Sequence, residues 1–189
     1  MKTHHTSEQG SKSIFQRAQE ALNKHDDIVE MILEDHKPLK ELIKVMKDSD
    51  RSLDERANAF AEFAPLLICH AKPEEQSLYI YMKNDEDLRE EGFEGDVEHA
   101  LADQLVEEIM RTDDPDLWGA RVKVLAELVE HHIQEEEDEL LPDFKKHSEV
   151  KDRRNIGVTF LALKTKLLEK GGEETPHEDN LGDEDTRTH

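Results

Sequence analysis

Residues 132–142 read His-Ile-Gln-Glu-Glu-Glu-Asp-Glu-Leu-Leu-Pro, and the rest of the chain is organised around this stretch. His132 and Glu136 are four residues apart, so on a helix their side chains share one face. A second copy of the arrangement occurs at residues 70–79, which read His-Ala-Lys-Pro-Glu-Glu-Gln-Ser-Leu-Tyr. In both copies another Glu follows directly, and an apolar pair lies three positions beyond it. The repetition with matching flanks indicates a common role for the two segments.

The composition favours one helical domain and excludes several functions. The chain has 189 residues, of which 38% are charged and only 5% aromatic, and its formal net charge is −22. Nucleic acid and anionic membranes repel so acidic a chain, so we expect neither as a partner. No apolar run approaches the roughly 18 residues of a transmembrane helix, and the first residues lack the apolar segment of a signal peptide. Cys69 is the single cysteine, which excludes an internal disulfide, and we expect a cytoplasmic protein.

Apolar residues recur every three or four positions, which predicts an all-α fold. We expect an up-down-up-down four-helix bundle over residues 26–148. Its helices are predicted at 26–48, 52–83, 96–111 and 115–146, with the charged, glycine-containing segment 84–95 as a loop. Outside the bundle we expect a polar N-terminal segment with a short helix (1–25), an accessory helix (149–170) and an acidic disordered tail (171–189).

Each of the four predicted core stripes contains a histidine, and two of them also contain a glutamate. The residues are His36, His70, Glu74, His99, His132 and Glu136. A single histidine on an apolar stripe is more often a hydrogen-bonded core residue than a ligand. Two buried carboxylates without partners would cost several kcal/mol each, however, and no Lys or Arg occupies these face positions. The joint pattern therefore predicts a bound metal.

Four imidazoles and two carboxylates can serve two ions, with carboxylates bridging a gap of roughly 3.5–4 Å. This donor set, which contains no thiolate, favours two iron ions. Manganese and zinc are the less favoured alternatives, since dedicated zinc sites are more often mononuclear.

Several further polar residues lie close in the sequence to the six predicted ligands. Asp103 lies four residues after His99 and is either a seventh ligand or an acceptor beside the site. The acidic residues next to the two His-x-x-x-Glu motifs are expected on the solvated flank: Glu75, Glu135 and Glu137. Tyr79 and Tyr81 are expected in core packing, with donation to a bound ligand as the alternative.

With these residues placed, the chain resembles the hemerythrin-like family, the His-His-Glu cation-binding domain. The resemblance spans about residues 27–147. It rests on Glu-Asp-His36, His70-x-x-x-Glu74-Glu-x-x-Leu-Tyr, Glu-His99 and His132-x-x-x-Glu136-Glu-x-Glu-Leu-Leu-Pro. It implies a four-helix bundle with a non-haem di-iron centre, in which the four histidines are terminal ligands and the two glutamates bridge.

The chain departs from the oxygen-carrying members of that family at two positions. Asp103 stands where those members look to have a fifth histidine. Glu136, at +4 from His132, stands where they use an aspartate at +5. The ligand set is more similar to that of intracellular members associated with iron sensing, redox stress and peroxide turnover.

Three functions remain open from the sequence. The leading one is a di-iron sensor or redox protein that binds O2 or its reduced forms. The second is an enzyme that consumes peroxide, as a catalase does, or NO. The third is a module in which the metal is a structural clamp and the acidic surface binds a basic partner.

Overall fold

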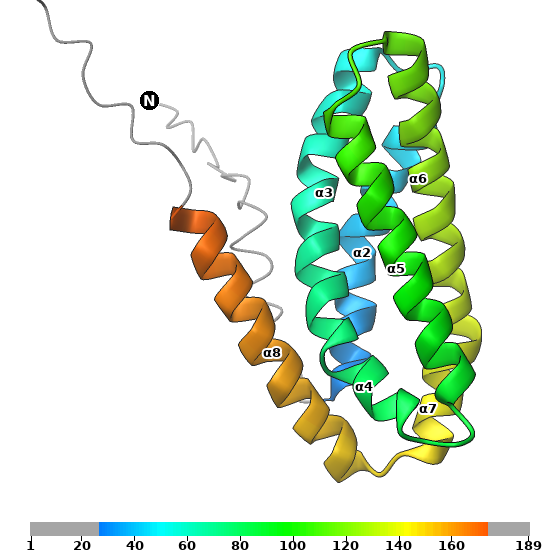
Figure 1. Ribbon diagram of the computed structural model, residues 1–189, viewed down its shortest axis with the longest axis vertical. Coiled ribbons are helices and arrows are strands. Elements are labelled where there is room, and N and C mark those ends of the chain that lie inside the picture. Colours follow the sequence, from blue (N-terminus) through cyan, green and yellow to red (C-terminus); the bar gives the residue numbers. More distant parts are fainter. Residues whose placement is uncertain (1–26, 174–189) are drawn as a thin grey trace, which may run out of the picture.

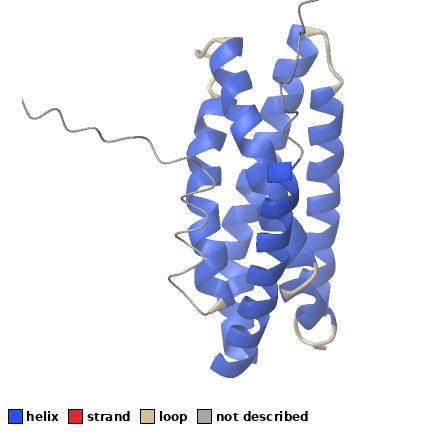
Figure 2. Ribbon diagram, turned by 90° about the vertical axis from the view of Figure 1, so that its left-hand side faces the viewer, coloured by secondary structure: helices blue, strands red, loops and turns tan. Residues whose placement is uncertain are grey.

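The computed structural model describes residues 27–173, and all regular structure in that range is helical (Figures 1 and 2). The all-α prediction is therefore confirmed. The elements in chain order are α2 (Ile28–Lys47), α3 (Leu53–Glu75), α4 (Leu78–Lys83), α5 (Arg89–Met110), α6 (Pro115–Glu135), the π-helix η1 (Glu136–Leu140), α7 (Leu141–His147) and α8 (Val150–Glu173). The predicted N-terminal helix and most of the predicted acidic tail lie outside the described residues.

Four long helices, α2, α3, α5 and α6, form the bundle, and α4 and α7 lie together at one end of it (Figure 1). α2 packs on α3 and α6, and α5 packs on α6. The helix starts follow local chemistry. Ser52 and Glu55 form a reciprocal capping box at the start of α3, and the Asp114 carboxylate accepts from two backbone amides at the start of α6.

Two apolar clusters fill the bundle, one on each side of a polar layer. One cluster contains Leu39, Phe63 and Val122, and the other contains Ile32, Tyr79 and Phe144. Along α2 the change from one cluster to the other falls between Ile32 and Leu39, where His36 lies. Water is thus excluded from both ends of the layer that holds the predicted metal ligands.

Two of the predicted segments have wrong boundaries, and a third helix has the expected bounds but contains an irregular turn. The helix predicted for 52–83 is interrupted after Glu75, because Pro73 disturbs the end of α3 and Ser77 leaves the helical conformation. The loop predicted for 84–95 is shorter, since α5 begins at Arg89. The helix predicted for 115–146 contains the π-helix η1, a widened turn of a kind that is frequent at functional sites.

α8 packs against α2 and α3. Its Ile156 and Phe160 are buried in the same cluster as Ile32, and Lys164 pairs with Asp35 of α2. Arg153 donates to Asp27 at 2.7 Å. The accessory helix therefore forms part of the packed structure, and it extends to Glu173 instead of ending at 170.

Candidate metal centre

The six residues predicted as metal ligands meet in the middle of the bundle. His36 comes from α2, His70 and Glu74 from α3, His99 from α5, His132 from α6, and Glu136 is the first residue of η1. All six are buried, with no residue more than 4% exposed. They will be called the buried cluster.

The imidazole Nε2 atoms and the glutamate carboxylates face one another. His36 Nε2 lies 3.1 Å from Glu136 Oε2, and His99 Nε2 lies 3.0 Å from His132 Nε2. His70 Nε2 lies 3.4 Å from Glu74 Oε2. Two triplets, His36–His70–Glu136 and His70–Glu74–His99, each bring three donor atoms within 4.8 Å of one another. The two triplets share His70, and donor groups arranged in this way suit a pair of neighbouring ions.

Glu74 shows most directly that the buried cluster is incomplete as a hydrogen-bonded core. Both of its carboxylate oxygens are buried and accept no hydrogen bond from residues 27–173. Neither ring nitrogen of His70 has a hydrogen-bond partner in that range. Such groups cost several kcal/mol when nothing compensates them, and a cation would compensate both at once. The donor set therefore fits a metal.

The charges of the two glutamates are strongly linked. Burial and the nearby charge of Glu136 raise the pKa of Glu74 well above its ordinary value. Burial also acts to raise the pKa of Glu136, but His132 and His36 outweigh it and hold that pKa below the ordinary value. Without a cation the cluster favours one carboxylate charge over two, and a bound metal would allow both.

The histidines of α3 and α5 are held in the form that binds metals. Burial lowers the pKa of His70 to about 4, against the partial opposition of Asp35. Burial likewise lowers the pKa of His99. Both rings are therefore neutral near pH 7, and a neutral imidazole has the lone pair that a metal requires.

Each histidine turns its other nitrogen, Nδ1, toward a carboxylate outside the cluster. His36 Nδ1 donates to Glu137 at 3.0 Å and His132 Nδ1 to Glu98 at 2.6 Å. The corresponding distances from Nδ1 to a carboxylate oxygen are 3.8 Å from His70 to Asp35 and 3.5 Å from His99 to Glu75. Carboxylates in this position orient metal-binding imidazoles and increase their basicity.

Each of these outer carboxylates is next in the chain to a residue of the buried cluster, as Asp35 is to His36 and Glu137 is to Glu136. Three of them also pair with a lysine. Lys40 donates to Glu137 at 2.7 Å, Lys72 to Glu75 at 2.9 Å, and Lys164 pairs with Asp35. Glu75 and Glu137 are partly exposed on the flank of the buried cluster, as expected, and each also faces the Nδ1 atom of a cluster histidine. Their adjacency to the ligands in both motifs was the signal that could have identified them.

Asp103 does not join the buried cluster. It is 29% exposed and pairs with Lys72, which in turn pairs with Glu75. Lys72 draws the carboxylate of Asp103 to the rim, although position 103 is one helical turn from His99. The structure therefore does not support Asp103 as a seventh ligand. Asp103 instead ends a series of contacts that runs from His99 through Glu75 and Lys72 to the rim.

Tyr79 reaches into the buried cluster. Its hydroxyl donates to Glu136 Oε1 at 2.8 Å and lies 3.5 Å from His132 Nε2, and its side chain is fully buried. The ring fits because position 95 is glycine: a Cβ there would lie 2.5 Å from Tyr79 Cζ. Tyr81, by contrast, packs edge-on against Phe144. Tyr79 is thus packed in the core, as expected, and its hydroxyl also donates to Glu136; donation to a bound ligand stays a prediction.

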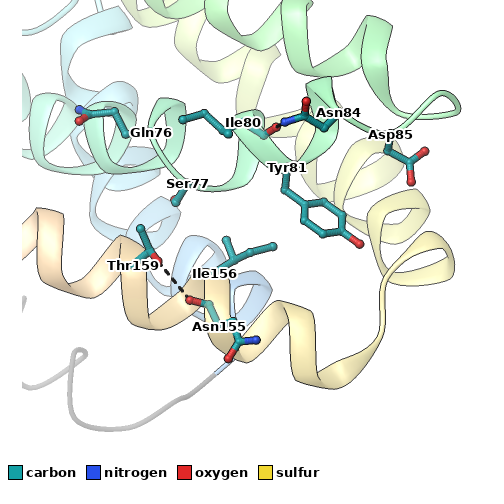
Figure 3. Close-up of a pocket in the computed structure, with 9 residues that line it drawn as sticks. All are labelled: Gln76, Ser77, Ile80, Tyr81, Asn84, Asp85, Asn155, Ile156 and Thr159. Carbon is teal, nitrogen blue, oxygen red and sulfur yellow. Dashed lines mark hydrogen bonds between the residues drawn. The ribbon is translucent and has the colours of Figure 1, made fainter.

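A separate pocket of about 560 Å³ lies between α4 and α8, lined by residues that include Ile80, Tyr81, Asn155 and Ile156 (Figure 3). The hydrogen bonds between the residues drawn in Figure 3 are those that Thr159 donates to the Asn155 carbonyl within α8 and that Asn84 donates to the Ile80 carbonyl. None of the six cluster residues lines the pocket.

Comparison with known proteins identifies one family. The model of the hemerythrin HHE cation binding domain matches residues 27–144, well over half of the chain. Comparisons with curated proteins and with solved structures gave no match. Within residues 27–173, no helix is long and apolar enough to span a membrane.

Proposed function

The chain belongs to the hemerythrin HHE cation-binding domain family, and from this premise we propose that its buried cluster holds two iron ions. In this proposal the ions would be held by the four histidines His36, His70, His99 and His132 together with the carboxylates of Glu74 and Glu136. The observation that carries the proposal is Glu74, a fully buried carboxylate whose two oxygens lack hydrogen-bond donors among residues 27–173. A cation would offset the cost of that burial while leaving the carboxylate ionised.

Iron is the preferred metal because of the donor set. Imidazole and carboxylate suit iron, manganese and zinc, whereas the thiolates that select copper(I) or iron–sulfur clusters are missing from the buried cluster. Two overlapping donor triplets favour a dinuclear site, and dedicated zinc sites are more often mononuclear.

Two iron ions in such a site would supply one-electron chemistry toward O2, peroxide or NO. The protein itself excludes bulk water, since apolar clusters close the layer on both sides. It also holds each Nδ1 near a carboxylate, which leaves the Nε2 atoms for the metal. We propose on this basis a sensor or redox protein that reacts with O2 or its reduced forms. With its single cysteine, it would suit the cytoplasm.

Tyr79 favours a second candidate function, the turnover of peroxide. Peroxide turnover requires the substrate to be oriented at the site, and the Tyr79 hydroxyl is a buried hydrogen-bond donor beside Glu136. Burial and the charge of Glu136 raise the pKa of Tyr79 well above its ordinary value, so the hydroxyl stays protonated and would serve as a hydrogen-bond donor to peroxide. Oxygen evolution from added peroxide distinguishes this enzyme from a sensor.

Metal analysis combined with an optical spectrum tests the proposal. We expect close to two ions per chain, mainly iron, with near-ultraviolet and visible absorption in the oxidised protein. Glu74→Gln should reduce the metal content, whereas Glu62→Gln, on the exposed face of the same helix, should leave it unchanged. A wild-type content that stays near one at saturation, or equal contents in the two variants, would refute the dinuclear site. A colourless protein saturated with zinc would instead support the structural-clamp function.

A further inference from the structure

The four outer carboxylates differ in one respect. Asp35, Glu75 and Glu137 each pair with a lysine, as described above. Glu98, the carboxylate that accepts from His132, pairs with no lysine or arginine among residues 27–173. Of the four outer carboxylates, Glu98 alone therefore has no lysine or arginine beside it among residues 27–173.

The side chains that face Glu98 are metal-binding groups. Across from it on α6 lie His131 and Glu135, one helical turn apart, with His131 Nε2 at 3.2 Å from Glu135 Oε1. Glu98, His131 and Glu135 can each offer one donor atom, and the three atoms lie within 4.8 Å of one another. α5 and α6, which carry them, pack side by side along the bundle (Figure 1).

We propose that Glu98, His131 and Glu135 form a second, solvent-facing site for a divalent transition-metal ion of the zinc type. The ion would occupy the position that a lysine occupies beside the other three outer carboxylates. One imidazole and two carboxylates are a donor set that such ions accept, with water completing the coordination.

Two features of the residues favour binding. Glu98 is already oriented, since His132 Nδ1 holds one of its oxygens at 2.6 Å and its side chain is only 17% exposed. His131 and Glu135 are 65% and 44% exposed, so an ion can reach them from solvent. Glu135, like Glu98, has no lysine or arginine partner among the residues that the structure describes. The exposure also implies weaker binding than in the buried cluster.

The site goes beyond the proposed function, because none of its residues belongs to the six that would hold iron. It nevertheless contacts the buried cluster through Glu98. An ion on Glu98 would withdraw electron density from the carboxylate and weaken its bond with His132, just as the lysines moderate the other three carboxylates. The buried centre would then respond to external metal.

Zinc titration of the purified, metal-loaded protein tests the site. The protein is desalted, its metal content is measured, and Zn²⁺ binding is followed by calorimetry. We expect His131→Ala to lose one equivalent of Zn²⁺, or to bind it at least tenfold more weakly, with the metal content before titration unchanged. His147→Ala is the matched control: this exposed histidine also faces an acid, Asp87, at 3.8 Å. Zn²⁺ bound by residues other than His131 and His147 contributes equally to all the proteins, so the difference between the two variants isolates His131.

A second variant supplies the missing lysine. Glu135→Lys places an ammonium group near Glu98 and should abolish the same equivalent of Zn²⁺ without lowering the melting temperature. Equal Zn²⁺ isotherms for the wild type and His131→Ala would overturn the proposal. So would a wild-type protein that takes up no Zn²⁺ after desalting. A protein purified without metal in the buried cluster would contradict the proposed function, yet a loss of one equivalent in His131→Ala would still support this site.

Discussion

Replacing Gly95 by alanine should destabilise the protein, although the same change usually stabilises a helix. Gly95 lies within α5, where alanine is favoured over glycine by about 1 kcal/mol. The added Cβ would lie 2.5 Å from Cζ and 2.6 Å from the hydroxyl of Tyr79. Because the Tyr79 ring is fully buried in a close-packed core, it has no free space into which it could move.

The cost follows from these contacts. Overpacking a well-filled core costs about 1–3 kcal/mol. Displacing the ring also breaks the 2.8 Å bond to Glu136, and a hydrogen bond to a charged group contributes about 1.5–3 kcal/mol. After subtraction of the gain in helix propensity, we expect a net loss of about 2–4 kcal/mol. For a chain of this size that corresponds to a fall of roughly 5–12 °C in melting temperature.

Thermal unfolding followed by circular dichroism measures the effect, with Gly119→Ala as the control. Gly119 lies within α6, and a Cβ there would meet its nearest neighbour, Arg56 Nη1, at an ordinary 3.4 Å. That variant should melt at or slightly above the wild-type temperature. In a Tyr79→Leu background the penalty of Gly95→Ala should largely disappear, since the two residues act through one contact. A Gly95→Ala protein as stable as the wild type would refute the reasoning, as would a penalty that persists without Tyr79.

The remaining predictions concern the buried cluster and its rim. Glu74→Gln should raise the melting temperature of the metal-free protein at pH 7 and lower that of the metal-loaded one. The folded-state pKa of Glu74 lies above its ordinary value of 4.5, so the contribution of Glu74 to stability is present below pH 4.5 and is lost as the pH rises through the folded pKa. Glutamine does not ionise and therefore avoids this loss of stability. Equal melting curves for the two metal-free proteins would contradict the prediction. Removal of metal by a chelator should lower the wild-type melting temperature by several degrees, on the scale of roughly 1 kcal/mol or more, and unchanged curves would exclude metal-linked stability. Asp103→Asn should leave the metal content and optical spectrum unchanged because Asp103 pairs with Lys72 at the rim, and a loss of metal would show that its carboxylate enters the site.

The sequence by itself determined the fold class and the residues that meet in the buried cluster. Helical periodicity is local, so the stripe that carries His132 and Glu136 could be identified without knowledge of its neighbours. The burial of the four apolar stripes in one common core could also be predicted, because amphipathic helices must pack their apolar faces against one another. A histidine on such a stripe can only point into the bundle, and this brings the six side chains into one layer.

Only the tertiary structure decided which polar groups surround that layer. Asp103 and Tyr79 both lie near a cluster residue in the sequence. Lys72 nevertheless pairs with Asp103 at the rim, whereas Gly95 leaves room for the Tyr79 ring inside the site. The lysines that neutralise Glu137 and Asp35 are 97 and 129 residues away in the chain, a separation at which sequence spacing indicates nothing about contact. Local propensity sets which faces are buried, whereas the partner of each buried polar atom is set by long-range contacts that form only in the assembled bundle.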